Sequence, residues 1–401
     1  MPAEQSPALP IARTCPYAPR DEHVRLRETD PVSKVTLPTG AEVWVVTRHE
    51  DIRALLADTR FSSDRRRPGF PMLDNGSGAP TDVLPPLLLT MDPPEHGPAR
   101  RAVLGEFTVK RMNKLKPRIQ EIVDEHIDRM LAGPRPVDLV RALSLPVPSL
   151  VISELLGVPY DDHAFFQSRS ASLVSRTVSQ EEKQKALFDL AGYLDELLRA
   201  KEEVPTDDLL GRQILRQREV NGAVDRKDLM GLAFLLLIAG HETTANMISL
   251  TMLQLVRDPG AREALRQDPG TTLPAVEELL RYFTIAEQAL ARVAVEDVEL
   301  GGRLIKAGDG VLALAHTANR DPRVFPDPDT FDVGRGARNH LAFGYGHHQC
   351  LGQNLARLEL QIVIDTLLRK IPDIRPAVPV DELSFKDDAI IYGIYEFPVT
   401  W

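Results

Sequence analysis

The stretch from Leu341 to Leu358 constrains the fold of this chain more than any other segment. It reads Leu-Ala-Phe-Gly-Tyr-Gly-His-His-Gln-Cys-Leu-Gly-Gln-Asn-Leu-Ala-Arg-Leu, with three glycines around one cysteine and a helical pattern after it. Gly344, Gly346 and Gly352 allow positive φ and close backbone approach. Cys350 stands where the next helix begins, so amide N–H groups and the helix dipole favour its thiolate form. A thiolate in such a loop is typical of a soft metal ligand.

Composition is that of an ordinary globular protein. The 401 residues are 43% hydrophobic and 26% charged, and no linker or charge block divides them. We therefore expect a single domain over 1–401, although length alone would suggest one domain per roughly 150 residues. A formal charge of −10 argues against nucleic-acid binding, which requires a basic face. Cys15 and Cys350 are the only cysteines, so a disulfide framework is not expected.

The chain carries no evident targeting or membrane signal. Its first residues, 1–19, are proline-rich and lack the apolar core of a signal peptide. The longest apolar run, Leu232 to Ala239, is far shorter than the ~20 residues that span a bilayer. We expect a soluble, cytoplasmic monomer that does not bind membranes.

Periodicity predicts a mainly α fold with a small β portion. A β-hairpin is expected over 35–47, and a long irregular segment, 61–86, suits a mobile lid over an apolar ligand. Helices are expected over 49–58, 92–105, 109–131, 146–156, 163–175, 182–201, 209–218, 228–257, 274–283 and from Cys350 to about Lys370. Short strands are expected over 291–295, 298–300, 304–305 and 311–314, with a C-terminal hairpin around Gly393 in 389–401.

The run Ala239-Gly240-His241-Glu242-Thr243-Thr244 interrupts the longest helical pattern. Glycine costs roughly 1 kcal/mol in a helix interior, and threonine is a weak helix former. The Thr243 hydroxyl can bond back to the Ala239 carbonyl and bend the helix. Residues that break an otherwise consistent helix indicate a functional site, although a close helix crossing would also require small residues here.

Glu278 and Arg281 are three residues apart, which places both charges on one helix face. Taken alone, this spacing describes a surface ion pair worth under ~1 kcal/mol. Zinc binding is a further alternative for the His347-His348-x-Cys350 run, but a structural zinc site needs four ligands and Cys15 is the only other thiol. Neither a Gly-x-Ser-x-Gly elbow nor a Walker loop is found.

The cysteine stretch resembles the haem-binding loop of the cytochrome P-450 family, in the spacing Phe343-Gly344-x-Gly346-x-His348-x-Cys350-x-Gly352. The resemblance implies haem b with Cys350 as the proximal iron ligand. The interrupted helix is similar to the family's oxygen-activation motif. By that resemblance Thr243 hydrogen-bonds dioxygen, and Glu242 helps relay protons from solvent.

The same resemblance implies further haem contacts and a structural cluster. The haem propionates need charged or hydrogen-bonding partners, which would be His96, Arg100, Arg292 and His348. Other residues expected to line the haem are Ala239, Gly240, Phe343 and Gly344. The family's structural Glu-x-x-Arg pair would be Glu278 and Arg281, with Arg335 as the third member.

The resemblance covers nearly the whole chain and is strongest to soluble bacterial class I members that hydroxylate polyketides, statin-like lactones, sterol-like compounds and xenobiotics. It implies insertion of one atom of O2 into a C–H bond, with electrons from NAD(P)H through ferredoxin reductase and ferredoxin. A ferredoxin is acidic, so a basic docking patch is expected at Arg101, Lys110, Arg111, Arg338, His347 and Arg357.

Substrate contacts are expected to be mainly apolar, which predicts a fairly large apolar ligand. The expected residues are Phe70, Met72, Leu87, Leu88, Leu173, Val174, Leu235, Ile238, Ala239, Ile285, Ala286, Ile390 and Ile391, with Gln288 as one of few polar groups. Two other classes stay open at this point. One is a haem-thiolate protein with another role, a peroxygenase, isomerase or gas sensor, against which Glu242 and Thr243 argue. The other is a non-haem helical binding protein.

Overall fold

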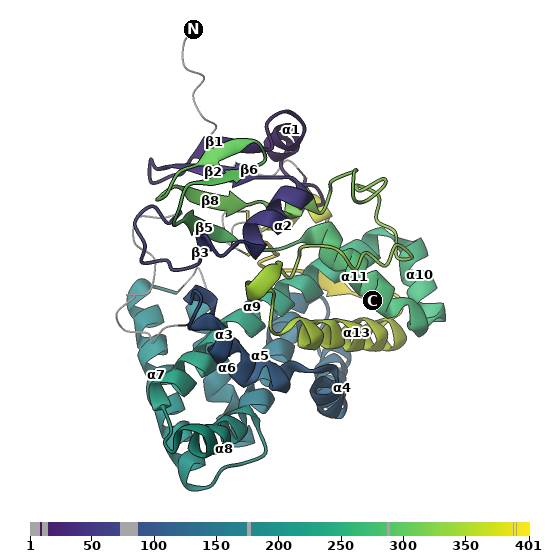
Figure 1. Cartoon of the computed structure of the whole chain (residues 1–401). Helices are drawn as coiled ribbons and strands as arrows, with labels where there is room; N and C mark the ends of the chain where they lie inside the picture. The colour runs from purple at the N-terminus through teal and green to yellow at the C-terminus, as the bar shows by residue number, and fades with distance from the viewer. Residues whose placement is uncertain are drawn as a thin grey trace.

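The computed structural model describes residues 9, 15–72, 87–174, 178–286, 289–387, 389 and 391–401. Most of these residues are helical, and the larger β-sheet lies at one end of the molecule beside α1 (Asp21–Thr29), at the top of Figure 1. The mainly α fold with a small β portion is therefore confirmed.

The larger sheet begins with the hairpin that the sequence predicts, β1 (Val32–Thr36) and β2 (Glu42–Val46). The sheet order is β1-β2-β8-β5-β3, in which β8 (Gly310–Ala313) runs parallel to β2 and antiparallel to β5 (Ala291–Ala294). Every residue of β5 and β8 is buried, as expected of strands covered on both faces. The edge strand β3 (Phe61–Ser62) occupies the start of the segment expected to be irregular, and residues 73–86 lie outside the described part of the chain.

A pair of short strands, β6 (Val298–Leu300) and β7 (Arg303–Ile305), forms a separate hairpin. The helices that surround the sheet and fill the rest of the molecule are α2 (His49–Ala57), α3 (His96–Leu104), α4 (Val109–Ala132), α5 (Pro146–Leu156), α6 (His163–Val174), α7 (Gln180–Glu203), α8 (Leu209–Asn221), α9 (Arg226–Arg257), α10 (Pro259–Gln267), α11 (Thr272–Phe283), α12 (Ala315–Ala318) and α13 (Gln353–Lys370).

The sequence did not predict α10, because Asp258-Pro259 was interpreted only as a stop signal for α9. The same two residues begin the next helix. Proline is tolerated at the first helical position, where its missing N–H would have no helical partner, and the Asp258 side chain accepts a hydrogen bond from the Ala261 N–H. One aspartate therefore ends one helix and caps the next.

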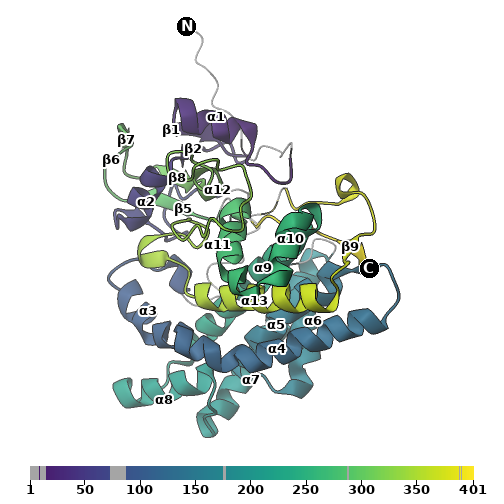
Figure 2. The ribbon, with the colours of Figure 1, turned by 90° about the vertical axis from the view of Figure 1, so that its right-hand side faces the viewer.

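Helix α9 runs through the interior and packs against α5, α7 and α13 (Figures 1 and 2). Its N-cap is Asp225, whose side chain accepts hydrogen bonds from the N–H groups of Lys227 and Asp228. By length and composition α9 could cross a membrane, but 61% of its most apolar window is buried inside the protein, as in the core helix of a globular fold.

The predicted hairpin around Gly393 is wrong. Phe385 forms a β-bridge with Ile394, so the chain turns before Gly393. The last strand, β10 (Pro398–Thr400), pairs with β4 (Val137–Asp138) and β9 (Arg375–Pro376). Alternation along the tail indicated extended structure, but it could not identify partners more than 20 residues away, because register depends on the whole buried face.

Helix α13 packs against α4, α9 and α11. Its buried side carries one acidic residue, Glu359. The residue is 2% exposed, and its Oε2 has no hydrogen-bond partner among the described residues. Burial disfavours the charged form and raises the pKa of Glu359 to about 8.

Glu359→Gln should stabilise the protein, and the gain should increase with pH. The folded-state pKa of Glu359 is about 8 against an ordinary value of 4.5, so its contribution is complete below the ordinary pKa and is lost as pH rises toward 8. Glutamine does not ionise, so the variant loses no stability from this site as pH rises. Between about pH 5 and pH 8 the difference in free energy of unfolding should grow by on the order of 2–4 kcal/mol, measured from urea midpoints. A difference independent of pH would contradict the buried, protonated carboxyl.

Candidate active site

The cysteine loop, residues 341–352, is shaped by two glycines and one backbone hydrogen bond. Gly344 and Gly346 have φ of +68° and +72°, a region that side chains disfavour. A Cβ at Gly346 would also overlap a carbonyl oxygen of α2. The Cys350 N–H donates to the Phe343 carbonyl at 2.8 Å and closes the loop. Gly352 does not use this freedom, since its φ is −80°, which any residue adopts.

Cys350 is half-buried and lies immediately before α13. Burial raises the pKa of its thiol, whereas the amide groups of Gly352 and Gln353 and the guanidinium groups of Arg100 and Arg357 lower it. Amide donors directed at sulfur are the environment of thiolate ligands. A metal cation bound to the sulfur would shift the thiol–thiolate equilibrium of Cys350 to the thiolate.

Buried polar atoms without partners gather beside this loop. His96 of α3 and His348 of the loop have ring centroids 4.2 Å apart, and Arg292 of β5 acts electrostatically on both. Among the described residues, His96 Nε2, His348 Nε2 and Arg292 Nε have no hydrogen-bond partner. Burial lowers the pKa of His96 to about 4, of His348 to about 2 and of Arg292 to about 10.

An anionic ligand fits this arrangement. Buried donors without acceptors are costly, and carboxylates would supply both the acceptors and the charge opposite to Arg100 and Arg292. A haem combines two such carboxylates with a metal that a single thiolate can hold. Zinc does not fit, since no group of three or more His, Cys, Asp or Glu side chains suited to a metal occurs in the described part of the chain.

The second part of the site is the centre of α9. The Thr243 hydroxyl donates to the Ala239 carbonyl at 2.6 Å, the bond that the sequence predicts. Ile238 is 44% exposed although Leu237 and His241 beside it are buried, so one face of this otherwise buried helix is not covered by the protein itself. Helix α13, which begins directly after the cysteine loop, packs against α9 (Figures 1 and 2).

Glu242 is engaged in an ion pair that the sequence did not indicate. Lys386 Nζ lies 3.1 Å from Glu242 Oε1, and the two side chains are 10% and 22% exposed. The residues are 144 positions apart, and the turn that carries Lys386 was predicted at the wrong place. No local sequence signal could have linked them.

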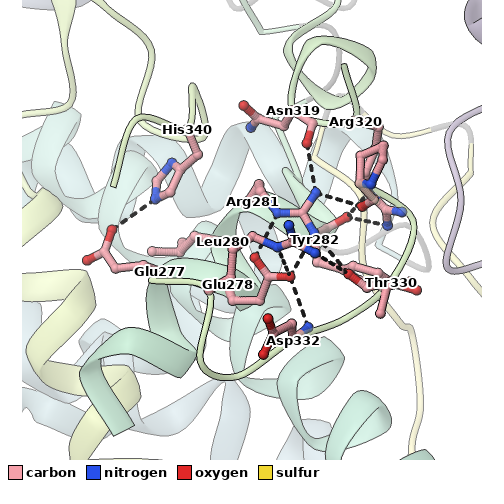
Figure 3. Close-up of polar contacts among 12 residues, drawn as sticks. Glu277, Glu278, Leu280, Arg281, Tyr282, Asn319, Arg320, Thr330, Asp332 and His340 are labelled. Carbon is pink, nitrogen blue, oxygen red and sulfur yellow. Dashed lines mark hydrogen bonds and ion pairs between the residues drawn. The ribbon is translucent and has the colours of Figure 1, made fainter. Parts of the chain in front are cut away.

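The buried Glu278 cluster consists of Glu278 and Arg281, which Figure 3 labels, together with Arg335. Two hydrogen bonds of 2.7 Å join Arg281 to Glu278, and neither side chain is exposed. Arg335 Nε donates to Glu278 Oε1 at 3.1 Å. Arg281 also donates to the Asn319 carbonyl, and the Asp332 N–H donates to Glu278. The cluster therefore ties α11 to the irregular segment before the cysteine loop.

A neighbouring network was not predicted. Glu277 contacts His340 Nε2 at 3.1 Å and Arg357 Nε at 2.5 Å. Burial alone would raise the pKa of Glu277, but hydrogen bonds from His340 and Arg357 outweigh it and lower the pKa to about 2. Arg357 also lies 4.6 Å from the Phe343 ring centroid. Arg357 is therefore half-buried and paired internally, and its place in a partner-docking patch stays a prediction.

Two further loop side chains differ from or extend the expectations. His347 was expected at the surface, but it is half-buried, with its ring centroid 5.6 Å from that of His96 and 4.7 Å from that of His348. Tyr345 had no assigned contact. Its hydroxyl accepts a hydrogen bond from Arg53 of α2 at 2.9 Å, and the same guanidinium lies 4.4 Å from its ring centroid.

The predicted substrate residues differ in exposure. Met72, Ile238 and Ala239 are exposed, and Ile285 is a core residue at 7% exposure. Half-buried members of the set are Phe70, Leu87, Leu88, Leu173, Leu235, Ala286 and Ile391. The Val174 side chain, Gln288 and Ile390 lie outside the described residues.

Three features of this helical fold together define the haem-thiolate class of proteins. They are the cysteine loop, the buried donors for carboxylates and the acid–hydroxyl pair in the central helix. The model of the family described as cytochrome P450 matches residues 21–371. The chain therefore belongs to the cytochrome P450 family, and it is a P450 monooxygenase.

Solved and curated relatives agree with this assignment. The crystal structure of cytochrome P450 MoxA from Nonomuraea recticatena, a CYP105 protein, is 57% identical, with a TM-score of 0.95 over 98% of each chain. The vitamin D3 dihydroxylase of Streptomyces griseolus is 48% identical over 99% of this chain and 97% of its own. The 20-oxo-5-O-mycaminosyltylactone 23-monooxygenase of Streptomyces fradiae is 41% identical over 99% of this chain and 93% of its own.

Arg281→Lys should destabilise the protein by about 3–5 kcal/mol or prevent folding, because lysine cannot form both bonds and leaves a buried carboxylate under-satisfied. The matched control is Arg266→Lys. Arg266 makes the same two-bond, i,i+3 contact with Glu263, but both side chains are 47% exposed. The control should change the urea midpoint little, because water screens an exposed pair. Equal losses in urea unfolding would show that burial does not determine the strength of the Glu278 cluster.

Proposed function

We propose that this monooxygenase hydroxylates a fairly large, apolar, secondary-metabolite-like molecule with O2 and electrons from NAD(P)H, delivered through ferredoxin reductase and ferredoxin. The observation that carries the proposal is the placement of Glu242 and Thr243 at the stretch of α9 that the protein itself leaves uncovered, while most of that helix is buried. An acid and a hydroxyl at an accessible point of a buried helix suit proton delivery.

The proposed cofactor is haem b. Cys350 would be its axial ligand, and the buried donors of His96, Arg292 and His348, with the Arg100 cation, would hold its propionates. Residues expected against the ring are Ala239, Gly240, Phe343 and Gly344. When bound, haem supplies the O2 and one-electron chemistry that side chains lack.

The chain's own residues would position the reactants and move protons. The bond from Thr243 to the Ala239 carbonyl holds the hydroxyl at one place on α9. Reducing one oxygen atom to water takes two protons, which an acid and a hydroxyl in sequence can pass inward. The Glu242 side chain is 22% exposed, so it is the member of the pair that can take up a new proton from solvent.

The substrate class rests on the predicted apolar contacts and on the relatives. Ile238, Leu235, Met72 and Phe70 offer apolar surface with few polar groups to orient a ligand. Two relatives are named for acting on vitamin D3 and on 20-oxo-5-O-mycaminosyltylactone. Both names support a large ligand for this chain.

We further propose a single P450 domain over 1–401 that works as a cytoplasmic monomer with separate redox partners and no nucleic-acid or membrane partner. Arg101, Lys110 and Arg338 are exposed, and Arg111 is half-buried. These cations are the proposed ferredoxin surface, because acidic partners are steered by a basic patch.

Thr243→Ala should uncouple the reaction. Losing the hydroxyl removes a proton donor, so we expect more NAD(P)H oxidised per product and more peroxide released, by about tenfold. Ser249→Ala is the matched control, because Ser249 makes the same back-bond to the Ala245 carbonyl on α9 but is 1% exposed. Its coupling should stay normal. Full coupling in Thr243→Ala would show that the hydroxyl is not needed for proton delivery.

Charge reversal at Arg101 and Arg338, to glutamate, should raise the KM for ferredoxin by about tenfold at low salt, since like charges slow association. The substrate-binding spectral shift should not change. Arg375→Glu is the control, because Arg375 is exposed at the far end of α13 from the cysteine loop (Figure 2). An unchanged KM in the double variant would place the ferredoxin elsewhere.

A further inference from the structure

The ion pair between Glu242 and Lys386 connects the acid of the α9 motif to the C-terminal turn, which we define as residues 384–387 and 391–395. Lys386 is 8% exposed as a residue, so its ammonium group is largely removed from water. A buried charge of this kind requires a partner. Glu242 Oε1, at 3.1 Å, is the carboxylate that meets Lys386 Nζ.

The backbone around Lys386 is fixed on both sides of the turn. The Lys386 N–H donates to the Gly393 carbonyl, and the Tyr395 N–H donates to the Ser384 carbonyl, both at 2.9 Å. The Phe385–Ile394 bridge lies between these bonds. Lys386 Nζ also lies 5.6 Å from the Tyr395 ring centroid. The ammonium group is thus presented to α9 by a paired segment.

The turn is also fitted closely to α9 itself. A Cβ at Gly393 would overlap the Asn246 side chain, one turn after Glu242. From the other side, Arg20 donates to the Asp387 carbonyl at 3.1 Å. The distance between Lys386 and α9 is therefore set by backbone contacts as well as by the ion pair.

The pair uses one of the two carboxylate oxygens. Glu242 Oε1 accepts the hydrogen bond from Lys386 Nζ, whereas none is found to Oε2 from the described residues. His241 next to it is buried, and burial lowers its pKa to about 4, so it stays neutral and does not compete for the carboxylate. One oxygen is fixed and the other is available to carry a proton.

We propose that Lys386 is a positioning residue for the monooxygenase reaction, which holds the Glu242 carboxylate in the one orientation from which it can pass protons toward Thr243. This inference rests on the proposed role of Glu242 and Thr243. Without the ammonium group, a half-buried carboxylate would turn toward water, where its charge is better solvated. The α9 motif would still contain an acid, but the carboxylate would no longer be oriented toward Thr243.

The test compares Lys386→Met, Glu242→Gln and the double variant, with the fraction of NAD(P)H that ends as peroxide as the readout. Lys386→Met keeps the alkyl stem and removes the charge, so we expect a rise of about fivefold in the peroxide fraction with substrate affinity changed less than twofold. Lys386→Arg keeps the charge and should restore most of the coupling. Because Lys386 acts through Glu242, adding Lys386→Met to Glu242→Gln should change nothing further.

A readout independent of turnover is the same double-variant cycle in urea unfolding of the ferric protein. The effects of Lys386→Met and Glu242→Gln on the midpoint should be non-additive, since the two side chains share one interaction. Lys370→Met is the control. Lys370 is paired with Asp124 at 2.7 Å and is 17% exposed, so its loss should lower the midpoint and leave coupling unchanged. If Lys386→Met does not fold, Lys386→Gln keeps a hydrogen-bond donor and replaces it.

The outcomes separate the two proposals. Normal coupling in both Thr243→Ala and Glu242→Gln would overturn the proton-delivery role of the motif. Uncoupling in Glu242→Gln with normal coupling in the charge-removing Lys386 variant would overturn the positioning role alone. Equal uncoupling by Lys386→Met with and without Glu242 would also overturn it, because Lys386 would then act through another group.

Discussion

The interaction on which the rest of the structure depends is the pair between Glu278 and Arg281, which has no exposed side-chain surface. Removing two charges from water is costly, and only good geometry with further hydrogen bonds compensates for it. Here Arg335 and the Asn319 carbonyl complete the set. An irregular segment has little regular structure to fix it, so this cluster determines where the chain lies as it enters the cysteine loop.

The cost of burying polar groups also identifies the functional site, where some of these groups have no partner. His96 and Arg292 are buried and His348 is half-buried, but a ring or guanidinium nitrogen on each of them is buried without a partner among the described residues. Folding therefore leaves a group of costly donors beside Cys350. A fold tolerates such a deficit where a ligand will supply the acceptors. Satisfied and unsatisfied buried polar groups thus separate the scaffold from the site.

Much of the fold followed from periodicity, because long amphipathic segments such as 109–131 allow few alternatives to a helix. The failures have specific causes. Asp258 both ends α9 and caps α10. A sequence signal for the end of one helix does not show that another helix begins at the same residue. The strand β10 pairs with β4 and β9, and alternation carries no information about distant partners. Ile285 shares the apolar character of the expected substrate contacts but lies in the core.

The sequence by itself determined the chemistry. A cysteine among glycines, an acid beside a threonine in a helix and a Glu-x-x-Arg spacing are local patterns, because each depends on residues within a few positions of one another. Tertiary structure alone decided which charges meet. Lys386 reaches Glu242 across 144 residues, and Arg357 turns inward to Glu277 instead of outward. Such pairs depend on how distant segments pack and on the cost of leaving a buried charge alone, which no local pattern records.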